Sequence, residues 1–154
     1  MAKRAPDDRI PIVSHWGISA GAVFDGAAEE MENVDLVFLQ TYSFLKDNPS
    51  ETNQRIVKHY CEMFSDSDRA DDIFAPVGTA HAYDVIHLLR LAIEKAQSTE
   101  GPAIREALEN LDSYTGLVRT YNPPFSSDKH DALDVQDFCL AEFGADGVIR
   151  PIGK

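Results

Sequence analysis

The sequence contains one short motif with the residue types of a serine hydrolase. Gly17-Ile-Ser-Ala-Gly21 fits the pattern G-x-S-x-G, and it follows a predicted strand and precedes a predicted helix. In such a nucleophile elbow the glycines permit a tight turn that exposes the serine hydroxyl, and nearby backbone N–H groups can stabilise an oxyanion. The motif therefore makes Ser19 a candidate nucleophile.

Residues 17–27 taken alone resemble the patatin-like serine hydrolases, which use a Ser–Asp dyad, and Asp146-Gly147 offers a matching Asp-Gly pair. However, only nine residues precede Ile10, so no glycine-rich oxyanion segment comes before the first strand. An Asp-Gly pair is also typical of a hairpin turn. We therefore favour a structural glycine loop and keep the hydrolase as the alternative.

Pairs of metal-binding side chains occur at helical spacing, but each pair lacks a third ligand. His59 and Glu62 share one predicted helix, and Asp84 and His87 share another, both at i and i+3. The acidic loop at residues 65–72 lacks the glycine and the closing glutamate of an EF-hand loop. The sequence contains no HExxH, P-loop or GxGxxG motif. We expect no metal site and no cofactor.

Aromatic and polar residues lie instead where open α/β sheets bind ligands. Trp16, the only tryptophan, is in a loop after a predicted parallel strand, and Tyr42 ends the next strand. Thr79, His81 and Tyr83 open the longest predicted helix, whose N-terminus can hold an anionic group. These residues suit a small polar solute, although burial of Trp16 and Tyr83 in a core explains the pattern equally well.

The charge balance excludes two classes of partner. The 154 residues include 26 acidic and 14 basic ones, which gives a net charge of -12. Nucleic acids and anionic membranes both require clustered Lys and Arg. No apolar run approaches the roughly 20 residues of a membrane span. Cys61 and Cys139 are too few for a disulfide framework or a four-thiolate zinc site.

The predicted elements mix strands and helices, which is the α/β class. Strands are expected at residues 10–13, 35–44, 117–121, 135–143 and 148–152, and helices at 22–31, 50–64, 79–96 and 102–111. The apolar start of the 35–44 strand predicts burial on both faces, as in a parallel sheet. Ser50 is a predicted N-cap, and Gly144-Ala-Asp-Gly147 is a predicted hairpin turn. A doubly wound sheet usually has four or more parallel strands, so part of this sheet is expected to be missing.

The order of these pieces resembles the later half of a type I periplasmic solute-binding protein. Within that family it is most similar to the receptors for branched-chain amino acids and related solutes that serve ABC transporters. The similarity rests on residues 10–17, 34–49, 81–96, 101–108, 114–119 and 144–147. It covers nearly the whole chain and depends on the order and spacing of these segments.

The resemblance implies two α/β lobes joined by crossing strands, with a solute bound between them. Residues 1–40 would end the second lobe, residues 41–112 would cross the hinge and supply late helices of the first lobe, and residues 113–154 would return as strands and a C-terminal hairpin. The N-terminal half of the fold and a secretion signal are expected to be missing. The full-length parent would be periplasmic.

The resemblance also implies a binding role without catalysis, for an amino acid, amide or organic acid and with an ABC permease as partner. Several amino-acid receptors have an acidic residue near the position of Trp16, whereas Trp16 would stack on a planar or apolar group or contact a cation. Exposed sheet edges predict a homodimer. The implied solute contacts are Trp16, Gly17, Ser19, Tyr42, His81 and Tyr83.

Overall fold

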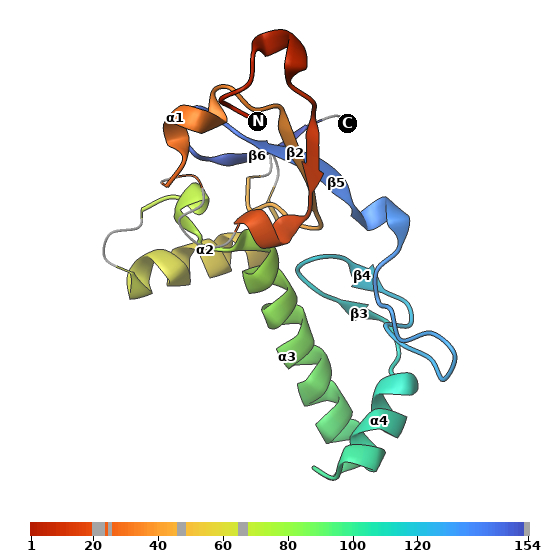
Figure 1. Cartoon of the computed structure of the whole chain (residues 1–154). Coiled ribbons are helices and arrows are strands. Elements are labelled where there is room, and N and C mark those ends of the chain that lie inside the picture. Colours follow the sequence, from red (N-terminus) through yellow and green to blue (C-terminus); the bar gives the residue numbers. More distant parts are fainter. Residues whose placement is uncertain (20–23, 25, 46–48, 65–67, 153–154) are drawn as a thin grey trace. The chain divides into compact units, whose positions relative to one another are not determined.

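The computed structural model describes residues 1–19, 24, 26–45, 49–64 and 68–152. The chain divides into two compact units. Unit 1 comprises residues 1–77 and 138–154, and unit 2 comprises residues 78–137 (Figure 1). No helix in the described ranges is both long and apolar enough to cross a membrane.

Unit 1 is built on a four-stranded mixed sheet with the order β1-β2-β5-β6 (Figure 1). The strands are β1 (Ile12–Ser14), β2 (Leu36–Gln40), β5 (Cys139–Phe143) and β6 (Ile149–Ile152). β1 and β2 are parallel, as predicted, whereas β5 is antiparallel to both β2 and β6. The C-terminal hairpin therefore joins the same sheet as the first two strands.

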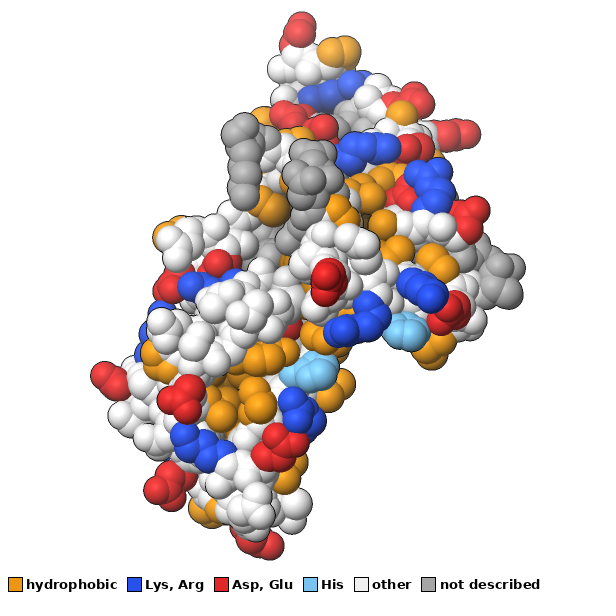
Figure 2. All heavy atoms as spheres, turned by 180° about the vertical axis from the view of Figure 1, so that it is seen from behind, with side chains coloured by type: hydrophobic (Ala, Val, Ile, Leu, Met, Phe, Trp, Pro, Cys, Tyr) orange, Lys and Arg blue, Asp and Glu red, His pale blue; other side chains and the backbone are white. Residues whose placement is uncertain are grey.

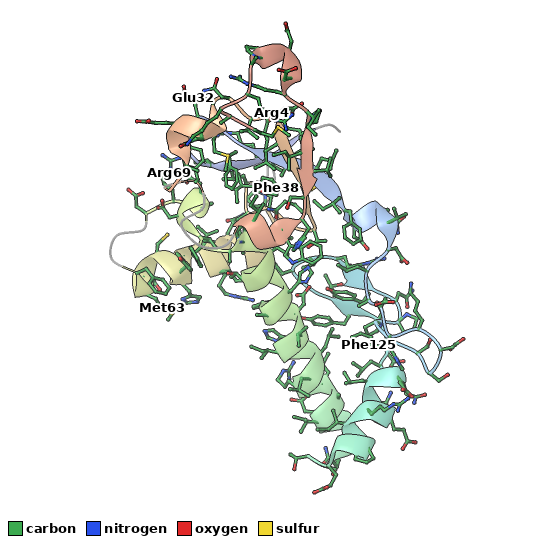
Figure 3. The ribbon with its side chains drawn as sticks, in the orientation of Figure 1. Arg4, Glu32, Phe38, Met63, Arg69 and Phe125 are labelled. Carbon is green, nitrogen blue, oxygen red and sulfur yellow. The ribbon has the colours of Figure 1, made fainter. Side chains whose placement is uncertain are left out.

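The two faces of this sheet differ in burial. Phe38 is buried on one face, 5.0 Å from Phe143 between ring centroids, and lies among the side chains inside unit 1 (Figure 3). On the other face Val13 is 70% exposed and Leu140 is 41% exposed. Val37, which shares that face, is only half-buried. The predicted burial of this strand on both faces is therefore wrong for one of them.

The second predicted strand is shorter than expected. β2 ends at Gln40, not at residue 44, because its pairing stops there: Cys139 opens β5 opposite Gln40, and β1 already ends at Ser14, opposite Phe38. The first predicted helix is also shorter, since α1 spans Ala28–Met31. Residues 20–23 and 25 of that prediction lie outside the described ranges.

The predicted N-cap and hairpin turn are both confirmed. α2 spans Glu51–Met63, and the Ser50 hydroxyl accepts a hydrogen bond from the Asn53 N–H at 3.2 Å. Gly147 has a φ of 78°, the left-handed conformation that glycine adopts without a steric penalty. It closes the turn between β5 and β6. Unit 1 also contains the 3-10 turns η1 (Pro6–Asp8), η2 (Trp16–Ser19) and η3 (Ala70–Asp72).

Unit 2 contains most of a long helix, a short helix and a two-stranded ribbon. The elements are α3 (Pro76–Ala96), α4 (Gly101–Glu109), β3 (Tyr114–Thr115), β4 (Thr120–Tyr121) and η4 (Val135–Asp137) (Figure 1). α3 begins three residues before the predicted Thr79, because Pro76 suits the first turn of a helix. Its residues 76–77 are grouped with unit 1.

The predicted strand at residues 117–121 is wrong in its first half. The N–H groups of Leu117 and Val118 donate to the Asp84 carboxylate at 2.5 and 2.9 Å, so they are not available to a neighbouring strand. The predicted strand at 135–143 likewise starts late. The Asp137 carboxylate accepts from the Asp134 N–H at 2.7 Å and closes a turn there, which leaves the strand to begin at Cys139.

The charged side chains follow the pattern expected from the composition. Figure 2 shows acidic and basic side chains interspersed over the visible face, with hydrophobic side chains exposed between them. That face presents no continuous basic patch.

Candidate functional site

An exposed pair of aromatic rings lies beside the loop that follows β1. The ring centroids of Trp16 and Phe138 are 6.4 Å apart, and His15 meets Trp16 edge-on at 5.6 Å. Trp16 is 38% exposed and Phe138 is 36% exposed, so both rings present surface to solvent. Such rings can stack on a planar group, cover an aliphatic chain or attract a cation. We call Trp16 and Phe138 the aromatic platform.

The platform is positioned by a compact turn, η2. The His15 Nδ1 accepts a hydrogen bond from the Gly17 N–H at 3.0 Å, and the Ser19 hydroxyl donates to the Trp16 carbonyl at 2.5 Å. A Cβ at Gly17 would lie 2.6 Å from the His15 ring, so only glycine fits without a shift. The turn therefore presents Trp16, while Gly17 and Ser19 hold its backbone.

The sequence did not identify Phe138 as a member of this group. Phe138 lies immediately before β5, at the point where the chain returns to unit 1. Its pairing with Trp16 depends on β2 lying between β1 and β5 in the sheet. The available signal was an apolar residue within the predicted strand at 135–143, which does not distinguish a surface ring from a core ring.

Among the described residues, Ser19 has neither a strained backbone conformation nor a free carboxylate as a partner. It ends η2, and the described non-glycine residues with positive φ are Ala75 and Gln97, so Ser19 is not strained in that way. Asp146 lines the same cavity of about 460 Å³ as Ser19. Both Asp146 oxygens, however, accept from the Arg150 guanidinium at 2.7 Å, and this bonding lowers the pKa of the carboxyl. Residues 20 and 21 of the motif lie outside the described ranges.

Tyr42 belongs to the core of unit 1. It is 4% exposed, and its ring lies 5.0 Å from that of Phe44 in an edge-on arrangement. Its hydroxyl accepts a hydrogen bond from the Asn53 side-chain amide at 2.7 Å, which ties the end of β2 to α2. The phenol is therefore occupied by a structural contact in this conformation.

His81 and Tyr83 lie in the second turn of α3, so the prediction that they open this helix is wrong. Residues two apart on an α-helix point about 200° away from each other, so one solute cannot contact both from one face. His81 is half-buried, and this burial lowers the pKa of its imidazole against the opposing effect of Asp84. The Tyr83 ring contacts that of His87 at a tilt of 47°, with ring centroids 4.3 Å apart.

His87 is part of an aromatic stack in unit 2. Its ring lies 6.5 Å from that of Tyr114, which in turn lies 6.1 Å from Tyr121. Burial, with a smaller effect from Asp84, raises the pKa of Tyr114 to about 12, and burial raises that of Tyr121 further still. These phenols stay protonated at neutral pH. Among the described residues, no group of three or more His, Cys, Asp or Glu side chains could hold a metal ion.

Solved structures share this arrangement of strands and helices. The leucine-binding protein LivK from Thermotoga maritima matches with a TM-score of 0.68 at 19% identity, over 92% of this chain and 36% of LivK. The substrate-binding protein LivJ from Streptococcus pneumoniae, solved with isoleucine, matches with a TM-score of 0.67 at 16% identity, over 92% of this chain and 37% of LivJ. An extracellular ligand-binding receptor from Rhodopseudomonas palustris gives 0.66 at 18% identity, over 92% and 40%.

This chain has part of the type I periplasmic binding-protein fold. The predicted fold is thereby confirmed, and the chain spans about two fifths of the length of the solved proteins it matches. These neighbours are described as binding proteins and receptors, not as enzymes. No protein-family model matches the sequence, and no curated protein is significantly similar to it. The binding-protein fold thus rests on the arrangement of the elements.

Proposed function

We propose that this chain binds a small organic solute as part of a two-lobed receptor. The observation that carries the proposal is the exposed aromatic platform beside the carboxyl end of β1, in a chain with the binding-protein fold. Open α/β sheets bind ligands at the carboxyl ends of their parallel strands. The isoleucine complex of LivJ supports an amino acid as the solute class.

The proposal assigns different parts of the solute to different groups. Trp16 and Phe138 would cover its aliphatic or planar part, since both rings have open surface. A cationic group over the Trp16 ring would gain about 0.5–1 kcal/mol at such an exposed site. Neither ring supplies a negative charge, so amides and organic acids remain members of the same solute class.

The two units would supply parts of two lobes. Unit 1 would belong to one lobe and unit 2 to the other, with the change of unit after Val77 and after Asp137. The resemblance instead places the change of lobe near residue 41, so the two schemes differ over residues 41–77. Delivery to an ABC permease from a periplasmic location would be the role of the complete receptor.

The single tryptophan makes the proposal directly testable. Because Trp16 is the only tryptophan, selective excitation of tryptophan fluorescence reports on the platform without the signal of the five tyrosines. Titration with isoleucine, leucine and the uncharged isovaleramide should give a saturable emission change for at least one of them. Constant emission together with an unchanged melting temperature, for all three at millimolar concentration, contradicts solute binding.

A matched pair of variants locates the binding site. Phe138→Leu removes one ring and keeps the Trp16 signal, and we expect it to weaken binding about three- to tenfold, the usual range for losing one aromatic contact. Phe64→Leu is the control, because Phe64 is another exposed ring of unit 1 that contacts a second ring, Tyr60, in a tilted arrangement. Equal affinities of Phe138→Leu and the wild-type chain would place the solute elsewhere.

A further inference from the structure

The side chain of Gln40 is a buried amide without a hydrogen-bond partner among the described residues. Gln40 is 1% exposed, and neither its Nε2 nor its Oε1 makes a hydrogen bond there. Native proteins leave few buried polar groups unpaired, and each one calls for a partner such as a water molecule or a ligand. The Gln40 side chain therefore has one unpaired donor group, Nε2, and one unpaired acceptor, Oε1.

Gln40 lies at the end of a strand, on the same face of the sheet as two other polar side chains. Gln40 is the last residue of β2 and pairs with Cys139, while Phe38, two residues earlier, pairs with Ser14. Paired residues share a face of a sheet, and so do residues two apart on one strand. Ser14, Gln40 and Cys139 therefore lie on the same face of three adjacent strands, with Gln40 directly opposite Cys139 and Ser14 opposite Phe38, one pair earlier. We call these three residues the polar row.

The row combines three chemical groups at one end of the sheet. It has a hydroxyl on Ser14, the amide of Gln40, and the thiol of Cys139, which donates to the Gln40 carbonyl at 3.6 Å. Ser14 and Cys139 are half-buried on either side of the fully buried amide. Trp16 follows Ser14 by two residues, so the polar row and the aromatic platform occupy the same end of the sheet.

We propose that the Gln40 amide binds a small group that accepts a hydrogen bond from Nε2 and donates one to Oε1. An internal water molecule has this chemistry, and so do the carboxylate and ammonium groups of an amino acid taken together. Either would satisfy both amide atoms with one small molecule. The version with a bound solute rests on the proposed function, whereas the version with water does not.

The test observes the Gln40 amide protons by NMR in the 154-residue chain. Through-bond correlations assign the two Nε2 protons, and Gln40→Met verifies the assignment because the pair of signals disappears. We expect nuclear Overhauser peaks from these protons to a long-lived water molecule in the free protein. The exposed Gln136 in η4 is the control, because surface water exchanges too fast to give such peaks.

Addition of isoleucine distinguishes the two sources. Replacement of the water peaks by peaks to isoleucine assigns the site to the solute, and unchanged water peaks assign it to internal water. If neither water nor isoleucine gives peaks with the Gln40 amide, the proposal is overturned. Failure of the wild-type chain to bind the tested solutes counts against the proposed function, and the water peaks still decide the present proposal.

Discussion

The Asp84 carboxylate accepts a hydrogen bond from the Tyr121 hydroxyl at 2.7 Å, although 37 residues separate the two. The same buried carboxylate accepts from the N–H groups of Leu117 and Val118. It thus takes up two backbone donors and one phenol in the interior of unit 2. Because burying a carboxylate is costly unless it is hydrogen-bonded, these three bonds hold the turn between β3 and β4 on α3.

The phenol bond to Asp84 predicts a difference between two stacked tyrosines. Tyr121→Phe removes the donor and should lower the free energy of unfolding by about 1–2 kcal/mol, as expected for a hydrogen bond to a charged group. Tyr114→Phe is the matched control, since its ring stacks on Tyr121, and we expect a change below about 0.5 kcal/mol. Urea denaturation measures both. Equal effects of the two variants would show that the hydrogen bond from Tyr121 to Asp84 does not contribute to the free energy of unfolding.

The close approach of Gly116 to Asp84 predicts that no side chain is tolerated there. A Cβ at Gly116 would lie 2.5 Å from Asp84 Oδ2, so Gly116→Ala must displace the buried carboxylate and should cost about 1–3 kcal/mol. Gly101→Ala is the control, because a Cβ there has nothing within 4 Å. We expect this control to be neutral or up to about 1 kcal/mol stabilising. A neutral Gly116→Ala in the same urea experiment would contradict the packing described.

Burial of His81 predicts a loss of stability in mild acid. Its pKa is lowered in the folded state, so the unfolded chain takes up the proton first as the pH falls through about 6.5. The free energy of unfolding should therefore decrease between pH 7 and pH 5.5. His81→Gln should flatten this dependence. An identical pH dependence in His81→Gln and the wild-type chain would assign the effect to other groups.

The hydrogen bond from Ser19 to the Trp16 carbonyl predicts that this serine is unreactive. We expect no stable adduct when the full chain is incubated with a fluorophosphonate and examined by intact mass spectrometry. The comparison is Ser19→Ala, which should likewise show no increase in mass after incubation with the fluorophosphonate. An adduct that forms on the wild-type chain and is lost in Ser19→Ala would instead support the hydrolase alternative.

The uncovered sheet face and the edge strand β1 favour self-association. Exposed Val13 and Leu140 lie on this face, and apolar patches of this kind mark interaction surfaces. We expect native mass spectrometry at micromolar concentration to show a dimer, and Val13→Lys to shift the population toward monomer. Val85→Lys, a change at an exposed apolar residue of α3, is the control. A wild-type chain that is fully monomeric refutes this prediction.

Part of the candidate site was readable from the sequence, and part was not. Trp16 was proposed as a site residue from its place after a parallel strand; the structure confirms that strand and leaves the ring partly exposed, a point that the sequence left open. Tyr42 has the same kind of position after β2, yet the structure buries it against α2. A strand end alone does not show which way the chain turns next, so it cannot separate a surface ring from a core ring.

The sequence by itself determined the elements whose stability is local. Ser50 starts α2 through a bond to a residue three positions away, and Gly147 closes the β5–β6 turn through its own backbone conformation. Only the tertiary structure decided what depends on distant residues. Trp16 contacts Phe138 because β2 lies between β1 and β5 in one sheet. The predicted strand at 117–121 forms a turn in its first half because the Leu117 N–H bonds to Asp84. Contacts over such separations depend on the packing of whole elements, which local spacing does not encode.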